Sequence, residues 1–276
     1  MKTGRFRWNA LMISGSLILA VMFLAGLSAP LLSPHDPLLV DLAQRLKPPD
    51  NEFLLGTDHL GRCVFSRLLH GARLSLSVSL CATGLSLLMG MAAGIGFGLA
   101  GPLLNTPLRG VIDVALAFPG MLLALVLAGI LGPSHTGLIL GIALAGCAWW
   151  MRFIRDQILH AMTREFVLAG RVVGARGPRL VQHYLIPQIL PPVLTAASLK
   201  TGWSIMAISA LGYLGMGAQP PSPEWGIMLQ ESRLYMVRAP WLLLGPGAAV
   251  TLTVLGFNLL AEGLRDAFQV KEAGFF

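Results

Sequence analysis

VALAFPGMLLALVLAGILGPSHTGLILGIALAGCAWWM, residues 114–151, contains no aspartate, glutamate, lysine or arginine. About 20 apolar residues in a helix cross the hydrocarbon core of a membrane, so this stretch is too long for one crossing and suits two. Gly132, Pro133 and Ser134 lie near its middle and favour a turn. The sequence therefore predicts transmembrane helices over 111–131 and 136–154, joined tightly.

Four further apolar stretches flank this pair and predict helices over 10–32, 74–99, 193–214 and 241–261. Charged residues make up 12% of the chain, against roughly 25% in soluble domains. The formal charge of +7 is scattered between apolar stretches, which argues against a nucleic-acid-binding face. The three cysteines show no paired spacing. We therefore expect an all-α integral membrane protein of about six transmembrane helices.

The first predicted helix has a second interpretation, a secretory signal peptide. Lys2, Arg5 and Arg7 precede it, and cleavage near Ala29 is the alternative to retention. Its charge-free stretch over 10–32 is longer than the roughly 7 to 15 apolar residues of a signal peptide, so we favour a retained anchor helix.

Lysine and arginine residues are unevenly divided between the two sides of six crossings. With the amino terminus inside, twelve fall on the inner side and seven on the outer side. Inner segments carry the excess of basic residues in membrane proteins, so we expect both termini in the cytoplasm. The remaining lysine, Lys200, lies about 10 Å from the inner end of the helix over 193–214 and is expected to reach the cytoplasmic surface.

Three glycines recur at every fourth residue in the helix over 74–99: Gly90, Gly94 and Gly98. This spacing lines small residues along one face and lets another helix approach closely. Glycine is also common in membrane helices in general, so the spacing could instead be coincidental. We expect this face to pack against a second helix.

The basic stretch between the fourth and fifth predicted helices carries the most specific pattern. Glu165-Phe-Val-Leu-Ala169-Gly170 is followed by Gly174 and, after nine residues, by a segment that ends in Pro187. The pattern resembles the EAA loop of permease subunits of binding-protein-dependent ABC importers, in which a Glu-Ala-Ala start is followed by a glycine and a hydrophobic-x-hydrophobic-Pro ending. Gly170 stands where that family has its second alanine.

The resemblance implies the fold of a type I ABC importer permease, in which this loop is a short amphipathic helix docked on a cytoplasmic ATPase. Its apolar ridge can be formed by Phe166, Val167, Val173 and Leu180. Gly174 then supplies a turn, and Glu165 is expected to make polar contacts with the ATPase. The alternative is an ordinary basic loop at the lipid surface.

The implied partners are a second homologous permease subunit, two cytoplasmic ATPase subunits and an extracytoplasmic solute-binding protein. The implied location is the bacterial plasma membrane, and no cofactor is expected. The chain has no GxxxxGK[ST] phosphate loop, so ATP hydrolysis would belong to the partners and the chain itself would not be an enzyme.

A second pattern follows the first helix. It comprises Leu55-Gly56-Thr57-Asp58-His59-Leu60-Gly61-Arg62-Cys63, then Ser66-Arg67 and Gly71-Ala72-Arg73. It resembles the hallmark segment of the dipeptide, oligopeptide and nickel branch of these permeases, although Cys63 stands where that branch usually has aspartate. Asp58, His59 and Arg62 either contact a docked binding protein or, as we favour, fold the segment through Asx-type turns and ion pairs.

We divide the chain accordingly into residues 1–72 and residues 73–276. The first part holds the cytoplasmic amino terminus, the first helix and an extracytoplasmic segment. The second part is a five-helix permease core with a cytoplasmic coupling loop over 155–192.

Other functions find less support in the sequence. His59, His70 and Glu224 lack the close spacing of metal ligands, so we predict no metal site. A stand-alone secondary transporter would show internal repeats or paired broken helices, and an intramembrane enzyme would carry a motif such as HExxH or GxSxG. Neither is found in the sequence. The transported substrate stays open between small peptides and nickel or its chelates.

Overall fold

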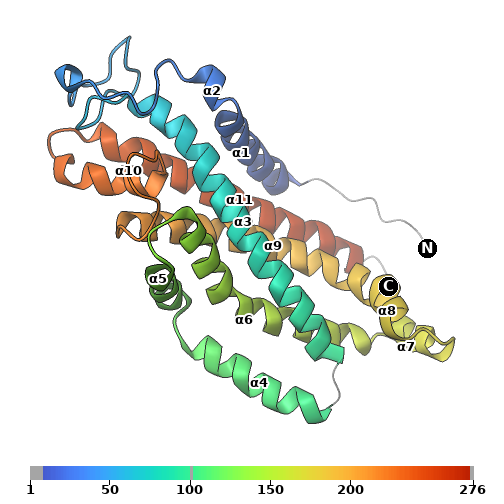
Figure 1. Ribbon diagram of the computed structural model, residues 1–276. Coiled ribbons are helices and arrows are strands. Elements are labelled where there is room, and N and C mark those ends of the chain that lie inside the picture. The colour runs from blue at the N-terminus through green and yellow to red at the C-terminus, as the bar shows by residue number, and fades with distance from the viewer. Residues whose placement is uncertain (1–8, 100–101, 274–276) are drawn as a thin grey trace.

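The structure, a computed structural model, describes residues 9–99 and 102–273 (Figure 1). Within those residues it consists of helices joined by turns and loops, with no β-strand. Lys2, Arg5 and Arg7, which contributed to the predicted orientation, lie outside the described residues.

Four helices are long and apolar enough to cross a membrane. They are α1 (Ala10–Leu27), α3 (Val64–Leu99), α6 (His135–Met162) and α11 (Trp241–Ala273, over Trp241–Phe268). The bent pair α4 (Pro102–Ala117) and α5 (Gly120–Leu131) adds a fifth crossing if it forms one span. The all-helical membrane class is therefore confirmed. The sixth predicted crossing lies in α9 (Ile186–Tyr213), which buries Thr201, Ser204 and Ser209 and stays a prediction as a span.

The predicted single helix over 111–131 is wrong. The chain bends by 85° between α4 and α5, at Phe118 and Pro119. A proline lacks the backbone N–H that continues a helix and disfavours helical geometry at the residue before it, so Pro119 accounts for the break. Pro119 is also the N-terminal cap residue of α5.

Several helices extend beyond the apolar stretches that predicted them. The helix predicted over 74–99 begins at Val64, the one over 136–154 continues to Met162, and the one over 193–214 begins at Ile186. Apolar patterning reports the part of a helix that lies in lipid, whereas backbone hydrogen bonds continue into the polar ends. The proposed division between residues 72 and 73 consequently falls inside α3.

α3 is the central element and extends along most of the molecule beside α6 (Figure 1). The three glycines spaced by four residues lie on the contacting face of α3. A Cβ added to Gly90 would lie 2.1 Å from Trp150 Cβ, and one added to Gly98 would lie 2.7 Å from Ile158 Cγ2. Gly94 stands similarly close to Ile154. Only glycine permits this approach of α3 and α6.

Short elements gather at the two ends of the bundle. One end, which we call the cap, comprises residues 33–63 with η1 (Leu42–Gln44), α10 (Trp225–Ser232) and η3 (Arg233–Tyr235), and α2 (Ala29–Leu32) leads into it. The other end carries α7 (Glu165–Val172), α8 (Gly177–Leu180) and the π-helical turn η2 (Val181–Leu185) (Figure 1).

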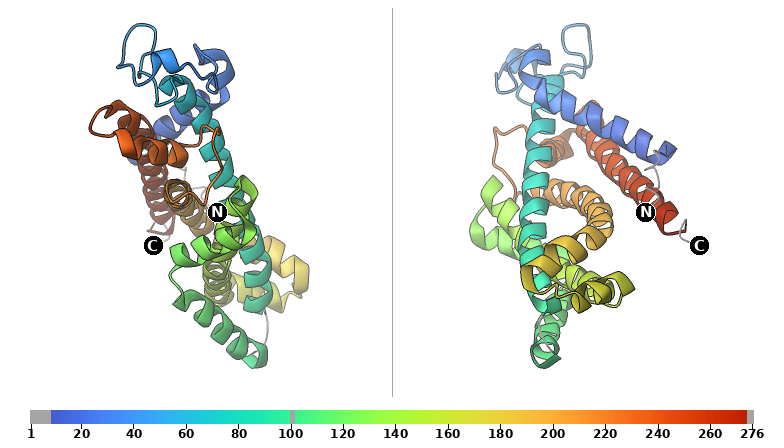
Figure 2. Two further views of the ribbon diagram at one scale, coloured as in Figure 1. Left: turned by 60° about the vertical axis from the view of Figure 1, so that its left-hand side comes forward. Right: turned by 90° about the vertical axis from the view of Figure 1, so that its right-hand side faces the viewer.

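The start of α1 packs beside the later part of α11. Asn9 Nδ2 donates a hydrogen bond to the Gly263 carbonyl at 3.1 Å, and α1 and α11 run side by side (Figure 2). The placement of both termini in the cytoplasm stays a prediction.

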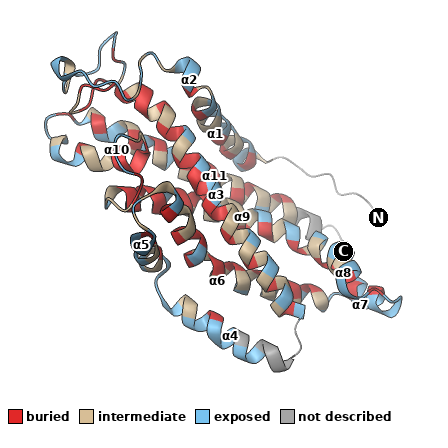
Figure 3. Ribbon diagram, in the orientation of Figure 1, coloured by how far each residue is buried: buried red, intermediate tan, exposed pale blue. Residues whose placement is uncertain are grey.

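Buried residues line the length of α3 and the facing sides of α6 and α9, whereas the cap loop, α4 and α7 are largely exposed (Figure 3). One buried cluster joins Trp150, Ile154 and Ile158 of α6 to Val167 of α7 and to Ile189 of α9. The base of α7 is thus part of the same core that rests on the glycine face of α3.

The glycine contact generates a stability prediction. In Gly90→Ala the new methyl group must push Trp150 away, and we expect overpacking to destabilise the purified protein by about 1–3 kcal/mol, seen as a lower Tm in detergent. Gly96→Ala is the control, because Gly96 lies on the same helix with nothing within 4 Å of an added Cβ. Equal Tm values for the two variants would contradict the close contact.

Candidate functional site

The exposed segment around α7 contains the EAA-like residues and is the first candidate site. Val167 is fully buried and packs α7 against the bundle. A Cβ added to Gly170 would lie 2.4 Å from the ring of Tyr184, so the position admits no larger residue without displacing that ring. Glu165 is exposed in the first turn, where a negative charge interacts favourably with the helix dipole. Ala169 is exposed on the following turn.

Gly174 ends α7 in a left-handed conformation, with φ of +89°. The Gly174 N–H donates to the Arg171 carbonyl at 3.1 Å, and the Ala175 N–H donates to the Gly170 carbonyl at 2.9 Å. These two bonds form a Schellman motif, which favours glycine because a Cβ strains this backbone conformation. The chain then enters α8 and η2, and Pro187 stands at the start of α9, directly after the π-helical turn.

The outer face of α7 is more apolar than a solvated helix requires. Phe166 and Leu168 are exposed, and Val172 and Val173 are exposed to 87% and 80%. We call these four residues the α7 apolar face. Of the predicted ridge, Val167 and Leu180 are buried in the bundle, whereas Phe166 and Val173 point outwards. The ridge is therefore divided between a face that holds α7 in place and a face without cover from the described residues.

Exposed arginines surround the α7 apolar face: Arg164, Arg171, Arg176 and Arg179. An exposed apolar patch with a charged rim is typical of a protein–protein contact surface. The geometry suits the docking of a partner with an apolar groove and acidic edges.

The cap contains the second family-like pattern, and its loop is held by Asp58. The Asp58 Oδ1 atom accepts hydrogen bonds from the Leu60 and Arg62 N–H groups at 2.8 and 3.0 Å, which makes an Asx-type turn. Gly61 has φ of +78°, and a Cβ there would lie 1.7 Å from the Asp41 carbonyl oxygen. Gly56 also has a left-handed conformation, with φ of +69°.

Neighbouring residues of the pattern join the cap to other segments. Thr57 is buried and accepts a hydrogen bond from the Lys47 N–H at 2.9 Å. Ser66 lies in the first turn of α3 and accepts one from the His35 N–H at 3.2 Å. The first bond joins the segment after η1 to the cap loop before α3, and the second joins the segment after α2 to the start of α3.

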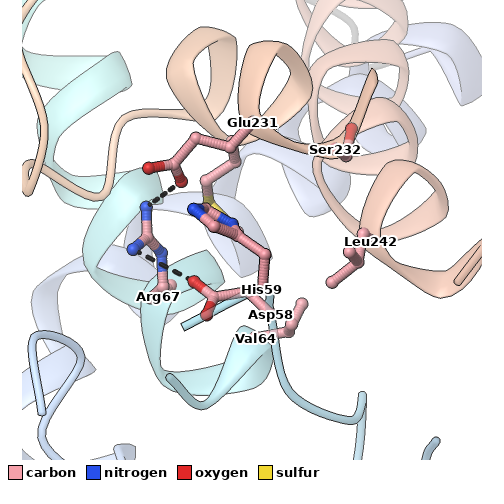
Figure 4. A pocket seen from close by; sticks show the side chains of 8 residues that line it. Asp58, His59, Val64, Arg67, Glu231, Ser232 and Leu242 are labelled. Carbon is pink, nitrogen blue, oxygen red and sulfur yellow. Dashed lines mark hydrogen bonds and ion pairs between the residues drawn. The ribbon is translucent and has the colours of Figure 1, made fainter. Parts of the chain in front are cut away.

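Two arginines and two carboxylates form a buried ion cluster where the cap meets α3. Figure 4 shows one of these arginines, Arg67, between Asp58 and Glu231. The Asp58 carboxylate lies 2.6 Å from Arg62 Nε and 3.3 Å from Arg67 Nη1. Glu231 of α10 lies 2.9 Å from Arg62 Nη2 and 2.8 Å from Arg67 Nη2. The two arginine side chains are only 1% exposed. Because the four charges balance, each buried guanidinium keeps carboxylate partners on both sides.

Glu231 was absent from the predicted site residues. It lies far along the chain from Asp58, in α10, between the apolar stretches over 193–214 and 241–261 that predicted helices. Glu224 marks the start of that helix: its carboxylate accepts bonds from the Gly226 and Ile227 N–H groups at 2.9 and 3.1 Å, as an N-cap does. An acidic residue directly before an apolar run was the signal for a helix. Burial raises the pKa of the Glu224 carboxyl.

The metal relay considered from the sequence is not brought together. His70 Nδ1 lies 3.0 Å from the Ser66 carbonyl of its own helix, and Glu224 caps α10. Asp58, His59 and Glu231 do place ligand atoms within 4.8 Å of one another. Both carboxylates already pair with arginines, which would repel a cation, so we assign this group to the fold of the cap. Burial lowers the pKa of His59, whose ring stacks on Tyr235.

The ion cluster generates a second stability prediction. Arg67→Met leaves two buried carboxylates with one arginine, and we expect a loss of about 3–5 kcal/mol in the free energy of unfolding. The measurement is the denaturation midpoint of the purified protein in detergent. Arg233→Met makes the same chemical change at an exposed position of the cap and should have little effect. An equally stable Arg67→Met variant would show that the cluster does not hold the cap.

Comparison with known proteins connects both candidate sites to one family. Residues 87–271, which include α7, match the profile described as binding-protein-dependent transport system inner membrane component. Residues 4–49 match that of the N-terminal transmembrane domain of oligopeptide transport permease C.

Similar curated proteins cover nearly the whole chain. A dipeptide transport system permease protein of Alkalihalophilus pseudofirmus is 38% identical, across 95% of this chain and 86% of the relative. The corresponding dipeptide protein of Escherichia coli K12 is 39% identical, across 96% and 91%. A nickel transport system permease protein of the same organism is 35% identical, across 94% and 93%. With a fold of apolar helices and an exposed α7 within the matched region, the chain belongs to the family of inner membrane components of binding-protein-dependent transport systems.

Proposed function

We propose that this chain is a permease subunit of an ATP-driven importer that carries small peptides across the bacterial plasma membrane. The observation that supports this function most is α7, a short helix that is held from beneath by Val167 and exposes the α7 apolar face. Such a helix is suited to be a docking element, because it is attached to the bundle on one side and exposes its other side to a partner. ATP hydrolysis then belongs to two separate cytoplasmic subunits, for which α7 is the docking element.

The remaining partners follow from the two ends of the bundle. The end that carries α7 faces the cytoplasm, because its exposed arginines agree with the excess of basic residues on the inner side of membrane proteins. The cap faces outwards and receives a solute-binding protein. A second, homologous permease subunit completes the path, with the cargo moving between the two permeases.

Peptide and nickel are the two candidate cargoes, because relatives of both names cover more than nine tenths of this chain. Small peptides are proposed first. Nickel, as the ion or a chelate, is the second candidate and is supported by the relative at 35% identity.

The docking role of α7 is tested by placing a charge on its apolar face. Val172→Asp puts a carboxylate on an 87% exposed side chain, and we expect at least a tenfold loss of copurifying ATPase subunits and of ATP-dependent dipeptide uptake in vesicles. The reason is that a buried, unpaired carboxylate is costly in an apolar contact. Val237→Asp is the matched control for ATPase copurification, since Val237 is 97% exposed and lies directly after η3, at the opposite end of the bundle.

Insertion of both variants is checked by their yield in the membrane fraction. Retention of the ATPases by Val172→Asp, or their loss only from Val237→Asp, would refute the proposed docking surface.

A further inference from the structure

A cavity of about 250 Å³ lies between α4 and the later part of α6. Because α7 follows the end of α6 directly, this cavity lies at the α7 end of the bundle. Charged side chains dominate its lining: Arg109 and Asp113 of α4, and Arg152, Arg155 and Asp156 of α6. We call these five residues the α4–α6 pocket. Three positive and two negative charges give it a net charge of +1.

One carboxylate at the centre of the pocket is shared by arginines of both helices. Asp113 Oδ1 accepts a hydrogen bond from Arg152 Nη1 at 3.3 Å, and Asp113 Oδ2 lies 3.8 Å from Arg109 Nε. A guanidinium carries five N–H groups, so these pairings leave donors on both arginines for a further anion. The Arg109 and Arg152 side chains are 65% and 50% exposed, which makes those donors accessible.

The pocket lies where the apolar layer of the bundle ends. Asp113 directly precedes the stretch over 114–151 that lacks acidic and basic residues, and Arg152 directly follows it. The ion pair between them therefore brings both ends of this stretch to one level. Trp149, one turn before Arg152, has the Lys200 ammonium 3.9 Å from its ring centroid. Tryptophan and lysine are typical anchors at the boundary between hydrocarbon and headgroups.

The surroundings of the pocket suit a lipid. Val111 and Val114 of α4 are 69% and 66% exposed, whereas Ile112 is buried. α4 thus directs its charged side chains towards α6 and leaves apolar side chains exposed, as expected of a helix at the edge of a bundle in lipid. The volume of the cavity is below the roughly 300–1,000 Å³ of pockets for drug-sized ligands and suits a single small headgroup.

The chemistry of the open donors suits a phosphate. The planar fork of a guanidinium matches two phosphate oxygens, and Arg109 and Arg152 present two such forks from different helices. The net charge of +1 favours a headgroup of charge −1 over a zwitterionic headgroup. Basic pockets between transmembrane helices bind anionic headgroups in this way.

We propose that the α4–α6 pocket binds the phosphate of an anionic phospholipid of the phosphatidylglycerol class. Arg109 and Arg152 donate to the phosphate oxygens, and the acyl chains extend into the lipid beside α4. The bound headgroup links α4 to α6 in addition to the ion pair between Asp113 and Arg152. Assignment to the cytoplasmic leaflet rests on the proposed function, whereas lipid binding itself does not depend on transport.

The test measures lipid binding by the complete transporter, purified in a neutral detergent with its second permease and ATPases. Dioctanoyl phosphatidylglycerol or dioctanoyl phosphatidylcholine is titrated, and native mass spectrometry with gas-phase dissociation counts the lipids bound to this chain. We expect the wild type to bind phosphatidylglycerol at least fivefold more tightly than phosphatidylcholine. A tenfold excess of inorganic phosphate should leave the bound phosphatidylglycerol in place, because the acyl chains also contribute to its binding.

Variants with opposite expected effects separate electrostatics from a damaged fold. Arg152→Gln should lose at least fivefold in affinity for phosphatidylglycerol. Asp113→Asn removes a negative charge from the same pocket and should gain at least twofold. Arg265→Gln is the matched control, because Arg265 is 54% exposed and pairs with Glu262 of its own helix. Its affinity should stay within twofold of the wild type.

Several results would overturn the inference. These are equal affinity of the wild type for the two lipids, equal losses in Arg152→Gln and Arg265→Gln, and weaker binding by Asp113→Asn. Displacement of the lipid by inorganic phosphate would instead indicate a site for a soluble anion. Binding by the isolated chain but not by the complete transporter would show that the second permease covers the pocket. A wild type that binds phosphatidylglycerol selectively but transports no cargo would refute the importer function and support the lipid site.

Discussion

The close contact between α3 and α6 is the constraint on which the rest of the structure depends. Gly90, Gly94 and Gly98 leave three positions without a side chain on the face of α3 that meets α6, and Trp150, Ile154 and Ile158 of α6 fill the space. In lipid the hydrophobic effect adds little between helices, so association depends on this kind of close packing. The same α6 residues continue into the core beneath α7, and the position of α7 is therefore set by glycines on another helix.

α3 links the two ends of the protein. Its first turns hold Arg67, which joins the buried ion cluster of the cap, and its last turns hold Gly98, which supports Ile158 near the base of α7. Buried ion pairs hold the cap in place, and apolar contacts hold α7 in place. A helix anchored at both ends in this way is suited to carry a rigid-body movement from one side of a membrane to the other, which an importer driven from the cytoplasm requires.

The sequence predicts the class of the fold well because uncharged apolar stretches of membrane length are typical of transmembrane helices. The sequence predicts less about the features that depend on tertiary contacts. Pro119 was the signal for the bend between α4 and α5, but uniform hydrophobicity around it concealed the break. The apolar residues of α7 could be identified in the sequence. Which of them face inwards, as Val167 does, and which face outwards, as Val172 does, depends on how α7 lies on α6. The sequence could not predict that Asp58 and Glu231 both pair with Arg67, since no local pattern links residues so distant in sequence.

The contact of the Lys200 ammonium with the Trp149 ring, 3.9 Å from Nζ to the ring centroid, shows the same limit, because Trp149 lies on a different helix. In the proposed function, these features are connected by an ATPase subunit that docks on α7. The most direct test places a photocrosslinking amino acid at position 172 or 237 in membranes that contain the assembled transporter. We expect an adduct with an ATPase subunit from position 172 and none from position 237. An ATPase adduct from position 237, or none from position 172 in an active transporter, would contradict a coupling role for α7.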